Sequence, residues 1–352
     1  MKYSKSKLLF VFIGLITLGL GVSSSYFLPE KYLYDAILIY NDPFTEKGLI
    51  GSYPVSMWFY SFFKLNKLSF STIGFIQVLI IFILFYIQGV PKKFEKLYLS
   101  NTLSWASLIV ISVYISIPSK EFINILFAFL IVFFLRKKLN NNFTHIALVL
   151  LLIILFGLWF RPYYGLIPFL AITSFVISKI KSKYKPVNII TASLLIAIFM
   201  SLSYGVVQGE YMSQGSREAL NQKRINEPDS QTLIFSPIKT NSAFGESIGI
   251  LYGYFSVNIP FEGLKFINKP HVILFVIWQL LLFLILFINY NRCLNQCRDN
   301  YNSKIWLFHI IFSYFIIQGI FEPDLGSSIR HKLGILPLIY EAMFYNRLKY
   351  IR

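Results

Sequence analysis

Charged residues are scarce in this chain. Asp, Glu, Lys and Arg make up only 14% of its 352 residues, whereas about a quarter of the residues are charged in a soluble globular domain. Hydrophobic residues make up 56% of the chain, aromatic residues make up 18%, and the mean hydropathy is +0.61. This composition excludes an ordinary soluble enzyme and predicts a protein that crosses a membrane several times.

Motifs that would indicate a cofactor are absent too. The sequence has no glycine-rich phosphate loop after a strand, no H-E-x-x-H metal motif and no G-x-S-x-G nucleophile motif. Its two cysteines, Cys293 and Cys297, are too few for a metal site, and we expect both to be free thiols. We therefore predict no cofactor and no metal, so the energy for any reaction must come with the substrate.

Apolar runs fill most of the chain. The formal net charge of +17 does not indicate nucleic-acid binding, because the Lys and Arg residues punctuate these runs instead of forming one patch. The stretch 51–63 is short, contains Pro54 and is rich in aromatic residues, so we expect it to lie at the membrane interface or to re-enter the membrane. We predict ten spanning helices, at 8–27, 72–90, 102–117, 121–135, 145–160, 166–180, 187–207, 271–290, 305–321 and 333–344.

The basic residues indicate an orientation. If the N-terminus is cytoplasmic and 51–63 does not span, every predicted inner segment is basic, as the positive-inside rule requires. We therefore predict an all-α, polytopic transmembrane helix bundle with both termini in the cytoplasm. It would form a single domain over 1–352, with one long external loop at 208–270. The predicted inner segments are 2–7, 92–96, 136–138, 179–185, 292–304 and 347–352.

A cluster of ionisable residues lies between two apolar runs near the C-terminus. The connection that begins at Glu322 also contains Asp324, Arg330 and His331. Ionisable groups at membrane level are costly, so such a cluster indicates a functional site by default. We expect it on the outer face, just before the last helix. Arg330 and His331 would act there, while Glu322 and Asp324 contribute to binding or hold that pair in place.

Other cations also lie at predicted helix ends or in the long loop. Lys120 starts a helix beside Glu121, Arg161 follows an apolar run, and Arg217 and Arg224 lie within 208–270. Arginine binds phosphate oxygens through two parallel hydrogen bonds, and helix N-termini favour anions. The pattern predicts a site for a lipid pyrophosphate. Simpler interpretations stay open, since Arg161 can anchor its helix in the headgroups and the loop arginines can be solvated.

A sugar on a lipid pyrophosphate would be activated for transfer, and a general base is then still required. His331 is the candidate by residue type, because imidazole titrates near neutral pH. Glu121 or Glu322 is the alternative, if burial raised its pKa.

With these features the chain resembles the Wzy-type polymerases of bacterial O-antigen and capsular polysaccharide. The resemblance rests on the number of spans, on the P-S-K-E turn at 118–121, on the external loop with Arg217 and Arg224, and on the S-I-R-H-K segment at 328–332. This chain lacks the second long external loop that is typical of the family.

The resemblance implies a metal-independent glycosyltransferase in the bacterial inner membrane. Such an enzyme transfers a growing glycan from undecaprenyl pyrophosphate to a sugar hydroxyl of another lipid-linked repeat unit. The implied partners are that oligosaccharide, membrane lipids and a chain-length regulator protein. Carried over to this sequence, the base would be His331 or Glu121, and the groups that bind phosphate or sugar would be Arg161, Arg217, Arg224 and Arg330. The charge pattern itself adds Lys120, Glu322 and Asp324 to the predicted binding residues.

Two other functions fit the sequence. A membrane glycosyltransferase that uses a polyprenyl-monophosphate sugar would need an acidic residue in the first external connection. Asp35 is a candidate there, with Glu30, Asp42 and Glu46 nearby. A flippase or transporter of lipid-linked oligosaccharide is the less favoured alternative, because it would show inverted repeats and charges at mid-membrane depth, whereas the predicted spans are apolar at mid-depth and the charges collect at one face.

Overall fold

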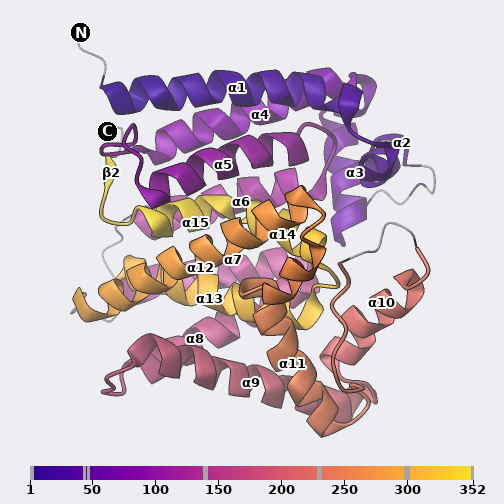
Figure 1. The fold of residues 1–352 in the computed structure, drawn as a ribbon, viewed down its shortest axis with the longest axis vertical. Helices are drawn as coiled ribbons and strands as arrows, with labels where there is room; N and C mark the ends of the chain where they lie inside the picture. Colours follow the sequence, from indigo (N-terminus) through magenta and orange to yellow (C-terminus); the bar gives the residue numbers. More distant parts are fainter. Residues whose placement is uncertain are drawn as a thin grey trace. The chain divides into compact units, whose positions relative to one another are not determined.

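A computed structural model of the chain describes residues 4–42, 45, 48–137, 142–227, 232–296 and 302–349 (Figure 1). Its regular structure is almost entirely helical, so the predicted all-α class is confirmed. The α-helices are α1 (Lys5–Phe27), α2 (Tyr34–Asn41), α3 (Ser52–Phe62), α4 (Phe70–Gln88), α5 (Leu99–Tyr114), α6 (Lys120–Arg136), α7 (Asn142–Trp159), α8 (Leu166–Ser178), α9 (Lys185–Gln208), α10 (Ala219–Arg224), α11 (Ala243–Asn258), α12 (Pro270–Gln296), α13 (Ser303–Phe321), α14 (Leu325–Gly334) and α15 (Leu336–Met343).

Shorter elements connect these helices. Two-residue strands β1 (Val90–Pro91) and β2 (Leu348–Lys349) pair antiparallel. A π-helical turn, η4 (Gln214–Glu218), leads directly into α10. The 3-10 turns are η1 (Glu30–Tyr32), η2 (Leu65–Lys67), η3 (Pro162–Gly165) and η5 (Phe261–Phe266).

The chain divides into two compact units. Unit 1 comprises Met1–Lys137, Phe156–Pro162 and Lys332–Arg352, and unit 2 comprises Lys138–Leu155 and Tyr163–His331. Unit 1 is therefore built from both ends of the chain. The sequence passes from one unit to the other after Lys137, within α7, within η3 and within α14. The predictions of a single domain and of an external loop at 208–270 stay predictions.

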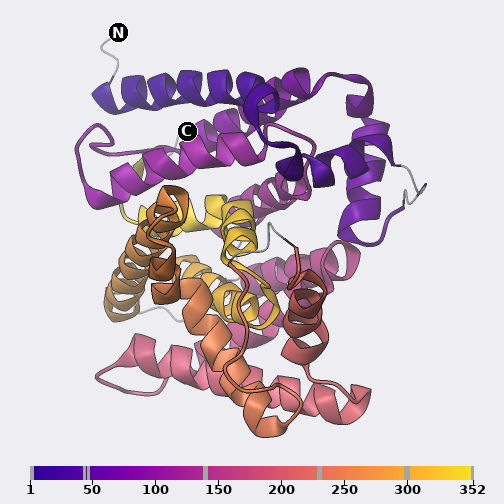
Figure 2. The same cartoon turned by 45° about the vertical axis from the view of Figure 1, so that its right-hand side comes forward.

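In unit 1, α1 packs along α4 and α5 (Figures 1 and 2). Phe10 stacks on Phe82 with 4.8 Å between the ring centroids. Near the other end of α1, a Cβ on Gly74 would lie 2.1 Å from the carbonyl oxygen of Gly21. Small residues allow apolar helices to approach this closely, as they do between helices in a membrane.

The helix α3 is too short to cross a membrane. Its 11 residues rise about 16 Å, whereas the hydrocarbon core is about 30 Å thick. It runs at a steep angle to α1 (Figures 1 and 2). Phe62 and Phe63, at the C-terminal end of α3, are exposed. These features agree with the interfacial interpretation of 51–63.

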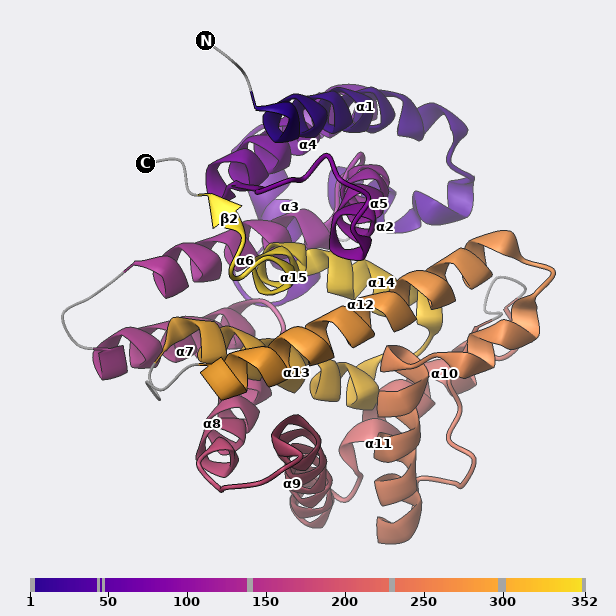
Figure 3. The same ribbon diagram turned by 60° about the vertical axis from the view of Figure 1, so that its left-hand side comes forward.

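In unit 2, α13 is the central helix. Nearly all of its residues are buried, and its neighbours are α8, α9, α11 and α12. Figure 3 shows α12 alongside α13, and Figure 2 shows α11 at a steep angle to α9. Phe175 of α8 stacks on Trp306 of α13 with 4.8 Å between the ring centroids.

Within the described residues, five helices are long and apolar enough to cross a membrane by length and composition, namely α1, α4, α9, α12 and α13. This finding supports a membrane protein but does not confirm ten spans. The predicted last span at 333–344 is wrong as a single helix, because the chain breaks at Ile335 and α15 has only eight residues. The cause is Pro337, whose ring prevents a helix from continuing through the preceding turn.

The predicted helix entry at 328–332 also needs correction. Arg330 and His331 lie inside α14, and they do not precede a helix N-terminus. The acidic residue Glu46 and the thiol of Cys297 lie outside the described residues, while Cys293 is buried in α12.

Candidate functional site

The N-terminus of α6 holds one group of predicted site residues. Ser119 caps this helix, since its hydroxyl accepts a hydrogen bond from the amide of Phe122 at 3.3 Å. The cap starts the helix at Lys120 and Glu121, and both side chains are buried. The P-S-K-E turn therefore places a cation and a carboxylate side by side in the interior of unit 1.

Lys120 contacts both an acid and an aromatic ring. Its Nζ lies 3.2 Å from Asp35 Oδ2 and 3.6 Å from the centre of the Tyr53 ring. The Tyr53 hydroxyl donates a hydrogen bond of 2.5 Å to Asp35 Oδ1. Cation–π attraction and ion pairing both hold the ammonium here. Asp35 of α2 and Tyr53 of α3 thus come from the connection that follows the first apolar helix.

Arg161 pairs with the neighbouring carboxylate. Its Nη2 lies 3.2 Å from Glu121 Oε1, and both side chains are less than a tenth exposed. Breaking a buried pair by removing one partner leaves an uncompensated charge. Asp35, Tyr53, Lys120, Glu121 and Arg161 together are called the α6 site below.

Sequence reasoning missed the residues that position the start of α6. The buried hydroxyl of Tyr60 in α3 accepts a hydrogen bond from Ser119 N at 2.9 Å and donates one to Gln77 Oε1 at 2.8 Å. Burial raises the pKa of Tyr60, which keeps the phenol protonated. The available signal was Gln77, an amide in the middle of the apolar helix α4.

A second group of predicted residues meets in unit 2. His331 Nδ1 lies 2.6 Å from Glu322 Oε1, and the Glu322 side chain is 3% exposed. Gln318 Nε2 donates to Glu322 at 3.4 Å and to the Ser328 carbonyl at 3.2 Å. The hydroxyl of Tyr314 donates to the main-chain carbonyl of His331 at 2.9 Å. The end of α13 thereby fixes the imidazole of α14 against a buried acid.

Asp324 begins the helix that carries His331. Its carboxylate accepts hydrogen bonds from Ser327 N at 2.7 Å and from Ser327 Oγ at 2.8 Å, which is an N-cap arrangement. The same carboxylate lies 3.5 Å from Arg224 Nη1, whose side chain is 40% exposed. The predicted positioning role of Asp324 thus has a physical basis. Arg224, Glu322, Asp324 and His331 are called the His331 site below.

Arg217 is not a solvated loop residue. Its side chain is fully buried in η4, where Nη1 donates to the Gly319 carbonyl at 2.7 Å and Nη2 donates to the Gly249 carbonyl at 3.0 Å. Nε and Nη2 also contact Glu218 Oε1, at 3.4 and 3.2 Å. Burial lowers the pKa of Arg217, and Glu218 opposes that shift. These contacts tie η4 to α11 and α13, so they favour a structural role.

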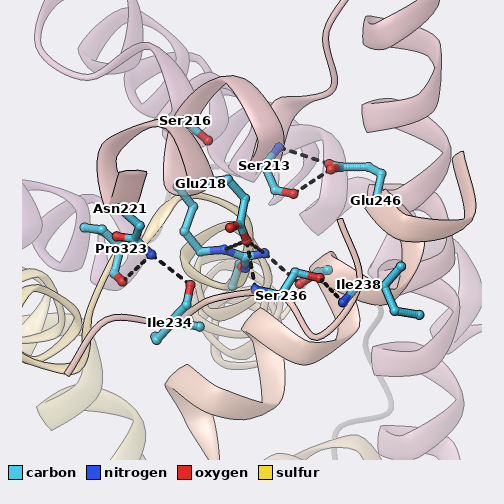
Figure 4. A network of polar contacts seen from close by, with 12 residues as sticks. Ser213, Ser216, Glu218, Asn221, Ile234, Ser236, Ile238, Glu246 and Pro323 are labelled. Atoms are coloured by element: carbon cyan, nitrogen blue, oxygen red, sulfur yellow. Dashed lines mark hydrogen bonds and ion pairs between the residues drawn. The ribbon is translucent and has the colours of Figure 1, made fainter. Parts of the chain in front are cut away.

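Figure 4 shows the polar network around η4. The buried carboxylate of Glu246 accepts hydrogen bonds from Ser213 N at 3.0 Å, from Ser213 Oγ at 2.6 Å and from Ser201 Oγ at 2.6 Å. This network connects the end of α9, η4 and the first turn of α11. Sequence reasoning missed it, because nothing in the sequence pairs Glu246 with Ser201 or Ser213.

The same figure shows how the connection after α13 is held. Asn221 Nδ2 donates to the carbonyls of Ile234 at 2.8 Å and Pro323 at 3.1 Å. Residues Leu233 and Asp324 also form an isolated antiparallel bridge. Asn221 and the segment at 233–234 therefore hold in place the connection that carries Glu322 and Asp324.

The predicted site residues fall into two groups, the α6 site and the His331 site. Lys120, Glu121 and Arg161 share the α6 site, which also contains Asp35. Arg330 lies half-buried on α14 next to His331. That both sites form a single pyrophosphate cradle stays a prediction. Among the residues that the structure describes, no three His, Cys, Asp or Glu side chains group as a metal site.

The fold thus belongs to the class of all-α proteins with apolar helices suited to a membrane. Comparison with protein-family models, curated proteins and solved structures gives no match to this chain.

Proposed function

We propose that this chain is a membrane glycosyltransferase that polymerises lipid-linked oligosaccharide repeat units. The observation that carries this proposal is the 2.6 Å contact between His331 and the buried carboxylate of Glu322. A carboxylate that orients an imidazole also stabilises the imidazolium that forms when the ring accepts a proton. The pair therefore has the geometry of a general base with its positioning residue. The resemblance to the Wzy-type polymerases supports the same reaction.

In the proposed reaction, the acceptor is a sugar hydroxyl on one repeat unit. Its oxygen forms a bond to the anomeric carbon of the donor glycan, and the bond from that carbon to the pyrophosphate oxygen breaks. His331 takes the hydroxyl proton, and undecaprenyl pyrophosphate leaves as the anion. Arg330 and Arg224 supply positive charge near the leaving group. The donor is already activated, so the proposed reaction is metal-independent and needs no cofactor.

The test compares two histidines of unit 2. His331→Ala should yield an inserted, abundant protein that leaves only single repeat units on a glycolipid gel. The matched control is His271→Ala, at the exposed start of α12, which should give the normal ladder of chain lengths. A normal ladder with His331→Ala would refute the assignment of the base. Glu322→Gln should reduce chain formation less than His331→Ala, because it removes the orienting charge and leaves the base.

A second candidate function is favoured by the α6 site. A glycosyltransferase with a polyprenyl-monophosphate donor would use Asp35 as the base and Lys120 to neutralise the single phosphate. The observation in its favour is the 3.2 Å contact between Lys120 Nζ and Asp35, in the connection where the sequence predicted such an acid. The phosphate would replace Asp35 as the partner of Lys120, which frees the carboxylate to accept a proton.

Two variants distinguish the donors. Loss of glycan transfer in Asp35→Asn, with normal transfer in Arg330→Ala, would support the monophosphate donor. The reverse result would support the pyrophosphate donor. Glu30→Gln is the matched control for Asp35→Asn, because Glu30 is an exposed acid in the same connection and should tolerate the change.

A further inference from the structure

The end of unit 1 opposite α2 and α3 joins three distant parts of the chain. Figure 1 shows the start of α1 and the strand β2 at this end. Ser6 Oγ donates to Glu95 Oε2 at 2.5 Å and accepts from Phe94 N at 3.2 Å. Lys92 N donates to the Arg347 carbonyl at 3.0 Å, next to the β1–β2 pair. The N-terminal helix, the connection after α4 and the C-terminal strand therefore form one surface.

The connection after α4 is rigidly held. Phe94 is fully buried and its ring contacts the rings of Phe10, Trp105 and Phe344. Asn101 Nδ2 donates to the carbonyls of two lysines in this connection, at 2.9 and 2.8 Å. An anchored aromatic ring and a bridging amide fix the path of the backbone, so its exposed side chains keep a defined arrangement.

All the exposed charged side chains in the described part of this surface are cations. Glu95 is the only carboxylate in the described segments 4–8, 89–98 and 346–348. Hydrogen bonding from Ser6 lowers the pKa of Glu95, and the nearby lysines act in the same direction. We call the exposed cations of these segments the basic surface, which comprises Lys5, Lys7, Lys92, Lys93, Lys96 and Arg347.

Lys93 shows that the arrangement is imposed by its surroundings. Its φ of 60° lies in the left-handed region, which is uncommon for residues other than glycine. A backbone of this kind persists only where neighbouring contacts over-determine it. Here its own carbonyl is held by Asn101.

Apolar side chains project beside these cations. Leu97 is 83% exposed, and Leu8 and Leu99 are each about half exposed. Leucine side chains that are exposed to water lose the free energy that burial would give them. The combination fits a bilayer interface, where cations contact lipid phosphates and aliphatic side chains enter the acyl region.

We propose that the basic surface binds the phosphate headgroups of anionic glycerophospholipids, with Leu97 inserted among their acyl chains. This inference goes beyond glycan transfer and does not depend on either candidate site. Each lysine near an anionic leaflet contributes a favourable electrostatic term. Three lysines acting together should strengthen lipid binding about 100-fold.

The test uses the full-length protein in a neutral detergent, titrated with phosphatidylglycerol, phosphatidylcholine or inorganic phosphate. Bound lipid is measured by native mass spectrometry. Phosphatidylglycerol should bind the unmodified chain, and the triple variant K92Q/K93Q/K96Q should bind it about 100-fold more weakly. Phosphatidylcholine should bind both proteins equally and weakly. The variant should melt at the same temperature as the unmodified chain when no lipid is added.

Two controls make the result decisive. The triple variant K181Q/K183Q/K185Q removes the same charge from the connection between α8 and α9 and from the first residue of α9, and it should change binding less than threefold. Equal losses in both triple variants would overturn the proposal in favour of a general charge effect. Leu97→Ser should weaken the binding of phosphatidylglycerol severalfold. If inorganic phosphate binds as tightly as the lipid and Leu97→Ser has no effect, the surface is a phosphate site and the lipid assignment is wrong.

Discussion

Replacement of Arg217 tests whether this buried cation stabilises the fold or binds substrate. The sequence predicted a pyrophosphate ligand, whereas the structure shows a guanidinium that donates to the carbonyls of Gly249 and Gly319 and pairs with Glu218. Arg217→Met keeps the approximate volume of the side chain and removes the charge and every donor. Two main-chain carbonyls and the Glu218 carboxylate then lose the donors that Arg217 supplies in unit 2, although Glu218 still accepts from Ser236 N.

The expected loss of stability follows from these contacts. A hydrogen bond from a charged donor contributes about 1.5–3 kcal/mol, and breaking a buried ion pair costs about 3–5 kcal/mol. The Arg217 side chain is 0% exposed, so solvent screening does not reduce these values. Arg217→Met should therefore lose about 3–5 kcal/mol in total. In a protein of this size, that corresponds to a fall in apparent melting temperature of roughly 6–10 °C.

The assay is thermal unfolding of the detergent-solubilised protein, followed by size-exclusion chromatography of what remains folded. Arg224→Met is the matched control, since it breaks a 3.5 Å pair whose cation is 40% exposed and should cost less than about 1 kcal/mol. An unchanged melting temperature in Arg217→Met, together with complete loss of long glycan chains, would refute the structural role and restore Arg217 as a ligand.

Three further perturbations have definite expected results. Gly253→Ala should prevent stable folding, because a Cβ there would lie 1.9 Å from Arg217 Nη1 and 2.1 Å from the Gly319 carbonyl oxygen. In the control Gly19→Ala, the added Cβ meets nothing within 4 Å, so this variant should fold normally. The yields of folded protein from the two variants check this. Tyr60→Phe should lower the melting temperature by an amount equivalent to about 1–3 kcal/mol, since it leaves Ser119 N without its hydroxyl partner; an unchanged value would contradict the positioning role. The pKa of Glu95 is lowered in the folded state, so its stabilising effect is present above the pKa of the unfolded chain and is lost as the pH falls through the folded pKa. Ser6→Ala should therefore flatten the loss of melting temperature on the acid side, measured between pH 3 and 6, and an identical pH profile would count against the contact.

The all-α class and most helix positions could be predicted from the sequence, because long apolar runs have few alternatives in a membrane. The predicted starts of α4, α6 and α13 lie within two residues of the observed ones. The prediction of the last helix was wrong, since the run at 333–344 looks continuous by composition. There the local effect of Pro337 divides it into α14 and the short α15.

The residues of the candidate sites could be predicted by type, but the contacts between them could be predicted only in part. Composition indicated that Glu121, Arg161, Glu322 and His331 were unusual, because a charge is costly near a membrane. It could not pair Glu121 with Arg161, since 40 residues separate them in the chain. Nor could it distinguish Arg217 from Arg224. Whether an arginine is buried depends on which carbonyls the fold presents to it.

The division of the chain has a consequence for biosynthesis. Unit 1 takes its first 137 residues from the start of the chain and its last 21 from the end, including β2 and α15. During translation, Arg136 of α6 must therefore wait for Glu341, and β1 must wait for β2, before these contacts can form. A chain that stops before Glu341 would leave both contacts of unit 1 unmade. Quality-control proteases should thus detect C-terminal truncations through exposed surfaces at the opposite end of the sequence.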